Sequence, residues 1–278
     1  MTVVLLATAC AVVYGTADFF GGLAAKRSRV LAVVLVSQIA GLLFVLPLLP
    51  LLPGVPGLDT IAWGMAAGLS GGLAVIMFYQ ALAGGVMSVV APTTATMSAA
   101  LPVLVGLTMG ERPEPLALCG VALALAAVVL VSRDSGSAAG RATLGPILRS
   151  LVAGLGFGGF FILLKQVPES AGVWPLLGAR TASVVVVAAL ALTTGRSLRP
   201  GRGALPAIIA TGVLDMAANV LYLLAVQRGL LILVAVLVSL YPASTLLLAR
   251  YVLGERLNAV QAAGVGLALG AVALIAAA

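Results

Sequence analysis

The sequence predicts an all-α membrane protein with ten transmembrane helices, because the chain is very apolar, almost free of charge and interrupted at regular intervals. Of its 278 residues, 62% are hydrophobic and 8% are charged, and the mean hydropathy is +1.23. Soluble domains carry about 25% charged residues, so this inventory could not cover a water-exposed surface. We therefore expect the lipid bilayer to be the main solvent and partner of the chain, as a multi-pass protein of the cytoplasmic membrane.

Ten apolar segments are long enough to be membrane spans, since a bilayer core needs about 20 apolar residues per helix. They are separated by basic loops, a proline-rich turn and glycine pairs. The segments lie at about 2–25, 30–50, 60–84, 86–109, 114–132, 145–167, 173–194, 204–227, 230–252 and 257–277.

The breaks between segments reveal an internal repeat. Tyr79 recurs as Tyr222, Gly110-Glu111-Arg112 recurs as Gly254-Glu255-Arg256, and Tyr14-Gly15 aligns with Phe157-Gly158, at an offset of 143 to 144 residues. This pattern predicts a first five-helix repeat over 1–132, a linker over 133–144 and a second five-helix repeat over 145–278. Because five is odd, the second repeat must cross the membrane upside down, which is typical of secondary transporters.

The composition also excludes several function classes. Histidine is absent, which removes the commonest metal ligand and general base, so we predict no metal, no cofactor and no enzyme activity. Cys10 and Cys119 lie in separate apolar segments and are expected to be inert thiols. The net charge of +7 arises from short loops between spans, so it indicates membrane orientation and no nucleic-acid partner.

Charged side chains at bilayer depth are costly and therefore mark candidate sites. Asp215 lies about eleven residues into its segment, or roughly 16 Å, which is near the midplane. Asn219 and Tyr222 follow at four and seven residues, so the three share one helical face. This stripe could bind an ammonium group, or a proton exchanged for substrate. The alternative is a buried structural carboxylate bonded to a neighbouring helix.

Two further charges lie inside predicted spans. Asp18 lies roughly 10 Å from the first basic loop, with Tyr14 one turn away. It is a candidate substrate ligand, or a carboxylate drawn to Lys26 or Arg27. Arg180 could hold a substrate carboxylate, or neutralise Asp18 or Asp215.

Several uncharged or peripheral residues complete the candidate set. Tyr79 is an interface or pocket aromatic, and Tyr241 precedes a proline that breaks its span. Lys165 either snorkels to the headgroups or reaches the site, and Gln38 could join helices. The pairs Gly64/Gly68 and Gly266/Gly270 have the spacing of close helix packing.

The duplicated tyrosine and Gly-Glu-Arg motifs resemble those of EamA-type transporters of the drug/metabolite transporter superfamily, over essentially the whole chain. The family's aromatic-Gly, Phe and Lys pattern is visible at Phe157, Gly158, Phe161 and Lys165. Gly22 stands where the family's lysine would fall in the first half, and Ser98 where the proline equivalent to Pro242 would fall. The resemblance implies export or exchange of small metabolites, such as amino acids, by alternating access.

The sequence therefore predicts a secondary transporter for a small metabolite or drug-like molecule, with proton coupling through a carboxylate. A non-transporting sensor or assembly subunit and a lipid-modifying membrane enzyme are the alternatives. The loops after spans 1, 3, 5, 7 and 9 carry eleven of the 15 Lys and Arg residues, which predicts that both termini lie outside. The resemblance implies termini inside.

Overall fold

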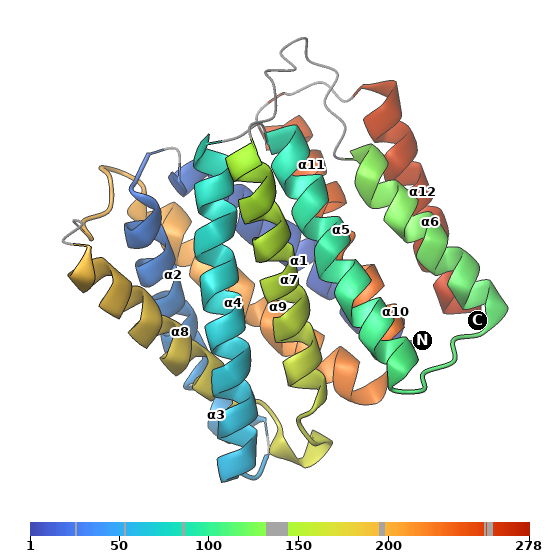
Figure 1. The fold of residues 1–278 in the computed structure, drawn as a ribbon, viewed down its shortest axis with the longest axis horizontal. Helices are drawn as coiled ribbons and strands as arrows, with labels where there is room; N and C mark the ends of the chain where they lie inside the picture. Colours follow the sequence, from blue (N-terminus) through green and yellow to red (C-terminus); the bar gives the residue numbers. More distant parts are fainter. Residues whose placement is uncertain are drawn as a thin grey trace.

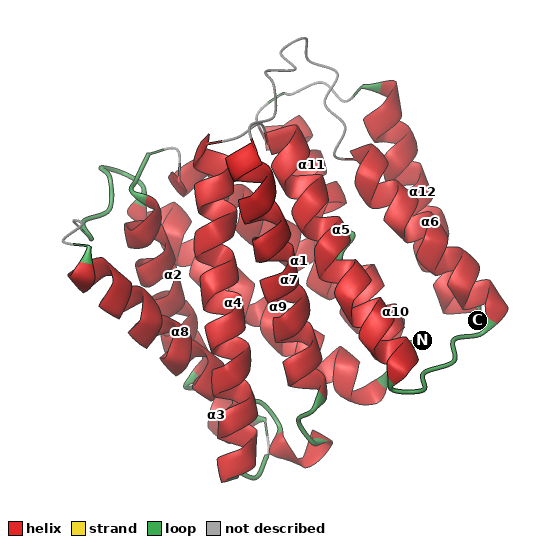
Figure 2. Ribbon diagram, in the orientation of Figure 1, coloured by secondary structure: helices red, strands yellow, loops and turns green. Residues whose placement is uncertain are grey.

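In the part of the chain that the structure describes, the elements are helices joined by loops, with no strand (Figure 2). This part of the computed structural model comprises residues 1–25, 27–52, 54–84, 87–131, 144–194, 198–252, 254 and 258–278. The helices are α1 (Thr2–Ala25), α2 (Val30–Val45), α3 (Leu48–Leu51), α4 (Leu58–Gly84), α5 (Met87–Thr108), α6 (Pro115–Val131), α7 (Leu144–Lys165), α8 (Trp174–Thr193), α9 (Leu205–Arg228), α10 (Leu231–Val238), α11 (Tyr241–Val252) and α12 (Ala259–Ala277), with a 3-10 turn, η1, at Glu169–Ala171.

Eight of the predicted spans are confirmed as helices long and apolar enough to cross a bilayer. Two of these are jointed: α2 continues into α3 over Val30–Leu51, and α10 continues into α11 over Leu231–Val252. The other two predicted spans contain shorter apolar helices, at Thr93–Thr108 and Pro115–Leu130. Large apolar side chains such as Leu43 and Leu269 are more than 60% exposed on the outside of the bundle, as expected for a surface that contacts lipid.

The helices pack as a bundle in which segments distant in the sequence are neighbours. α1 packs against α9, α4 packs against α7 and α8, and α2 packs against α8 and α9. α6 and α12 pair at one edge of the bundle, and α2 and α8 lie at the opposite edge (Figure 1). The two chain ends lie at the same end of the bundle in this view.

Glycines allow the closest of these helix contacts. A Cβ on Gly64 or Gly68 of α4 would collide with the backbone carbonyls of Pro175 and Ala179 of α8. The predicted packing role of this pair is confirmed, because only a residue without a side chain lets the two backbones approach so closely. The same prediction for Gly266 is wrong: no described atom lies within 4 Å of the place where its Cβ would stand.

Two charged side chains cap the turn between α9 and α10. The Lys165 Nζ donates to the carbonyls of Val226 (2.9 Å) and Gly229 (2.7 Å) at the end of α9. The Glu111 carboxylate accepts from the N–H groups of Leu231 (2.7 Å) and Ile232 (2.9 Å) at the start of α10. A cation at a helix C-terminus and an anion at an N-terminus both satisfy orphan backbone groups and oppose the helix dipole. Lys165 therefore has a structural role here.

Replacing Glu111 by alanine is expected to lower the free energy of unfolding by about 1–2 kcal/mol, because two N–H groups at the start of α10 lose their acceptor. Glu111→Gln should lose less, since one carbonyl oxygen remains. Thermal unfolding of the purified protein in detergent measures the change. Glu114→Ala, at an exposed position three residues away, is the control, and an equal melting temperature for Glu111→Ala and Glu114→Ala would contradict the capping role.

Candidate functional site

A cavity lies near the middle of the bundle and is lined by residues of α1, α2, α4, α5, α7, α8, α9 and α11. It has about 100 Å³ of room for the centres of water-sized molecules, several times the ~10–15 Å³ that one water needs. Seven of the eight site residues predicted from the sequence line it, namely Tyr14, Asp18, Tyr79, Arg180, Asp215, Asn219 and Tyr241. Helices from both halves of the chain therefore contribute to one pocket that contains charged, polar and apolar side chains.

Arg180 is the centre of the charged part of the cavity. Its guanidinium donates to the Asp215 carboxylate and to the Gln38 side-chain carbonyl. The Arg180 side chain is 9% exposed and that of Asp215 is 31% exposed, so the pair lies at the cavity surface, largely out of contact with solvent. Of the roles considered for Arg180, the structure shows the neutralising ion pair with Asp215.

The ion pair is extended by two further polar side chains. Asn219 Nδ2 donates to the backbone carbonyl of Asp215 (2.7 Å) and to its Oδ2 atom (3.2 Å). The Tyr14 hydroxyl donates to Asn219 Oδ1 (2.8 Å). A continuous network thus runs from Tyr14 on α1 through α9 and α8 to Gln38 on α2. Because each buried polar group has a partner, the network fixes the rotamers of its members.

Asp18 differs from Asp215 in having no such partner. It lines the cavity, and no residue in the described part of the chain donates a hydrogen bond to its carboxylate or forms an ion pair with it. Arg27, one of the two predicted partners, is exposed at the end of α1, and Lys26 lies outside the described residues. Asp18 and Asp215 line the same cavity. Asp18 therefore remains a candidate, without an ion-pair partner among the described residues, for binding a ligand or a proton.

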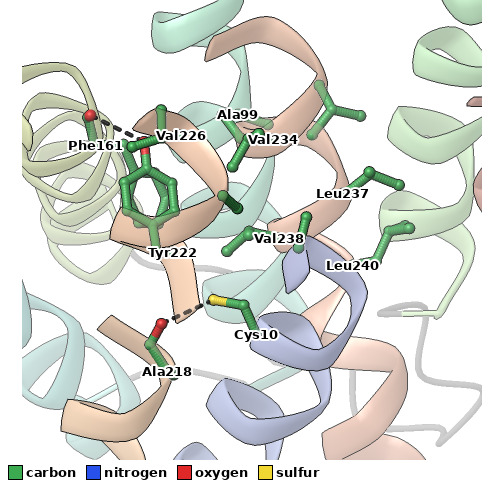
Figure 3. Close-up of a cluster of buried hydrophobic side chains, with 14 of the residues drawn as sticks. Cys10, Ala99, Phe161, Ala218, Tyr222, Val226, Val234, Leu237, Val238 and Leu240 are labelled. Atoms are coloured by element: carbon green, nitrogen blue, oxygen red, sulfur yellow. Dashed lines mark hydrogen bonds between the residues drawn. The ribbon is translucent and has the colours of Figure 1, made fainter. Parts of the chain in front are cut away.

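Tyr222 is the one predicted site residue that does not line the cavity. Its ring stacks on that of Phe161 at a centroid distance of 4.4 Å, its hydroxyl donates to the Phe161 carbonyl (2.9 Å), and its side chain is fully buried (Figure 3). Cys10 lies nearby, and its thiol contacts the Ala218 carbonyl at 3.2 Å. Tyr222 shares the face of Asp215 but lies two turns further along α9, roughly 10 Å away along the axis. At Tyr222, this face of α9 packs in the hydrophobic core and no longer faces the cavity.

Several cavity residues were not among the predicted ligands. Gln38 was considered only as a helix-joining amide, and the aromatic wall of Phe78, Phe157, Phe160 and Phe161 was not assigned to the site. The available signal for the wall was the repeat offset, which aligns Phe157 with Tyr14 and Phe161 with Asp18. Single polar residues are easy to find in an apolar helix, whereas apolar pocket residues look like any other core position.

A multi-pass helical membrane protein with a charged cavity between its helices has the general form of a membrane transporter. The chain belongs to the EamA-like transporter family, whose model matches residues 1–133 and again residues 144–277. A solved crystal structure described only as "Crystal structure of protein" is 18% identical, over 98% of this chain and 95% of that chain, with a TM-score of 0.77, and so shares its fold. A comparison with curated proteins finds no match. Membership of a transporter family supports the prediction that the chain is not an enzyme.

Proposed function

We propose that this protein is a secondary transporter that moves a small metabolite or drug-like molecule across the cytoplasmic membrane by alternating access. The observation that carries the proposal is the central cavity, because residues from both halves of the chain meet there around three charged side chains. Amino acids and related compounds are the substrate class suggested by the family resemblance, and export is the proposed direction. A proton taken up by one carboxylate provides the coupling, so a flux that is insensitive to an imposed pH gradient would count against this step.

The proposed architecture is ten helices in two inverted repeats, over 1–132 and 145–278. Two observations support it. The family model matches the two halves separately. Helix pairing is also duplicated: α1 packs on α9 as α7 packs on α4, and α2 packs on α9 as α8 packs on α4. In this arrangement α10 and α11 together are the equivalent of α5, and α12 is the equivalent of α6.

The duplicated pairing has a functional consequence. Each half contributes its first helix to a contact with the third helix of the other half, and the cavity lies between these two contacts. If the halves tilt against each other, one contact can loosen while the other stays closed. Rocking of similar halves about a fixed central site is the general basis of alternating access.

Two-sided labelling of a cavity cysteine tests this function. We expect Ser98→Cys, at a position that lines the cavity, to react with a membrane-impermeant cationic methanethiosulfonate from either side of sealed proteoliposomes. The background carries Cys10→Ala and Cys119→Ser, which remove both native thiols. Time-resolved mass spectrometry measures the labelled fraction of the protein after the reagent is added outside the proteoliposomes or trapped inside them.

The control is Ala99→Cys, whose side chain is fully buried beside the cavity in α5 and should stay unlabelled from both sides. Labelling of Ser98→Cys from one side only would contradict alternating access. That result would favour a non-transporting sensor or assembly subunit.

A further inference from the structure

The helices that form the cavity wall differ in the chemistry of their side chains. α1 and α9 contribute Tyr14, Asp18, Asp215 and Asn219, whereas α7 and α4 contribute mainly apolar positions, namely Phe157, Phe160, Phe161, Gly71, Val75 and Phe78. At the repeat offset of 143 residues, Tyr14 corresponds to Phe157 and Asp18 to Phe161. The cavity therefore has a polar side where α1 meets α9 and an apolar side where α7 meets α4.

Arg180 supplies one positive charge to the polar side and can balance only one of the two carboxylates, Asp18 and Asp215. When Asp18 is ionised, the three described charges that line the cavity therefore sum to −1. Arg180 donates to Asp215 and Gln38, so its positive charge is already balanced by the Asp215 carboxylate. An ionised carboxylate in a poorly hydrated site needs a cation nearby. Asp18 therefore favours a ligand with one positive charge.

The apolar side offers aromatic surfaces. The rings of Phe78 and Phe157 meet edge to face at 6.1 Å, and those of Phe160 and Phe161 do so at 5.8 Å. Gly71 lets the Phe160 ring pack closely against α4, since a Cβ there would come to 3.0 Å from the ring. Edges and faces of aromatic rings are suitable surfaces for an apolar group or another ring.

Two tyrosine rings border the junction of the two sides. Tyr79 and Tyr241 line the same cavity as Asp18, and the Tyr79 hydroxyl lies against Gly21, three residues after Asp18. A carboxylate combined with aromatic faces is a favourable environment for an alkylammonium group, because the ring quadrupole attracts the cation.

We propose that the preferred substrate is a small amphipathic monocation, in which an amine bound at Asp18 is joined to one aromatic or apolar group that lies against Phe157, Phe160 and Phe161. This inference rests on the proposed transport function and narrows the substrate class from amino acids and related compounds to amines that lack a carboxylate. The volume of about 100 Å³ is on the scale of the ~150 Å³ cavity that holds benzene, so a single ring is the appropriate size. A zwitterionic amino acid is disfavoured, because its carboxylate would meet Asp18 and Asp215 while Arg180 is already paired.

Binding of four matched probes to the purified full-length protein in detergent tests the proposal. The probes are 2-phenylethylamine, L-phenylalanine, 3-phenylpropionate and ethylamine, which vary the charge and the ring separately. Isothermal titration calorimetry should show 2-phenylethylamine binding at least about 10-fold more tightly than the other three, which corresponds to ~1.4 kcal/mol. Equal or tighter binding of L-phenylalanine or 3-phenylpropionate would overturn the proposal.

The variant Asp18→Asn should weaken 2-phenylethylamine binding by about 30-fold, as expected when a charge pair loses one partner. It should remain folded, because Asp18 has no partner among the described residues. Asp59→Asn, exposed in the first turn of α4, is the control and should bind as the wild type does. Unchanged binding by a folded Asp18→Asn would also overturn the proposal.

The labelling and binding experiments together separate the two proposals. If Ser98→Cys is labelled from both sides and 2-phenylethylamine does not bind, the substrate inference fails alone. If 2-phenylethylamine binds and labelling is one-sided, only the transport function fails.

Discussion

Replacing Arg180 by alanine is expected to abolish transport and to lower the free energy of unfolding by about 3 kcal/mol. The variant leaves the Asp215 carboxylate without its counter-charge and the Gln38 carbonyl without its donor. Removing one partner of a buried ion pair costs about 3–5 kcal/mol. We expect the lower end of this range, because the Asp215 side chain keeps 31% of its surface exposed. Thermal unfolding in detergent and substrate flux in proteoliposomes measure the two effects.

The double variant Arg180→Gln/Asp215→Asn separates stability from function. It removes both charges and keeps side chains that can hydrogen-bond to each other, and neutral replacement of a buried ion pair is often tolerated. We expect most of the stability to return while transport stays lost, because the charge balance of the cavity has changed. A double variant as unstable as Arg180→Ala would show that the ion pair is not what stabilises this region.

Introducing a methyl group at Gly68 or Gly212 is expected to give the next largest effect. The Cβ of alanine at position 68 would overlap the Ala179 carbonyl of α8, and at position 212 it would overlap the Ser37 carbonyl of α2. Both helix pairs would have to separate, next to the cavity that they line. Overpacking of this kind costs about 1–3 kcal/mol, so each variant should have a clearly lower melting temperature and reduced transport.

Gly266→Ala is the matched control for these two variants. Gly266 is also inside a helix, and no described atom lies within 4 Å of its added Cβ. The substitution should be neutral or stabilising, by up to about 1 kcal/mol, because alanine is a better helix former. If Gly68→Ala and Gly266→Ala melted at the same temperature, the close approach of α4 and α8 would not matter for stability.

Much of the fold could be predicted from the sequence, because bilayer spans leave a strong local signal. Long apolar runs, and the basic or glycine-containing turns between them, indicated where eight of the predicted spans lie. The Tyr241-Pro242 pair predicted a break in the ninth span, and the joint of α10 and α11 lies immediately before it, at Ser239 and Leu240. The packing of Gly266 was mispredicted, because spacing alone does not identify the face that contacts another helix.

The site was predicted only in part, because single charges can be recognised in the sequence whereas contacts between helices cannot. Charges inside apolar helices stand out, so Asp18, Arg180 and Asp215 were found without knowledge of the fold. Their pairing depends on how α8 and α9 pack, which no spacing within one helix reveals. Tyr222 shares a helical face with Asp215, but position along the helix axis decides whether a side chain reaches the cavity. Glu111 accepts hydrogen bonds from residues 120 and 121 positions away, a contact that a local motif cannot predict.

The proposed transport mechanism requires the two halves to cross the membrane in opposite directions, and single-cysteine labelling tests this most directly. Arg29→Cys and Ser170→Cys place exposed thiols in the loops that follow α1 and α7, the first helices of the two halves. In a background without Cys10 and Cys119, each variant is treated in intact cells with a membrane-impermeant maleimide, before and after permeabilisation. We predict that one variant is labelled in intact cells and the other only after permeabilisation. Labelling of both from the same side would contradict the inverted architecture, and with it the proposed transport mechanism.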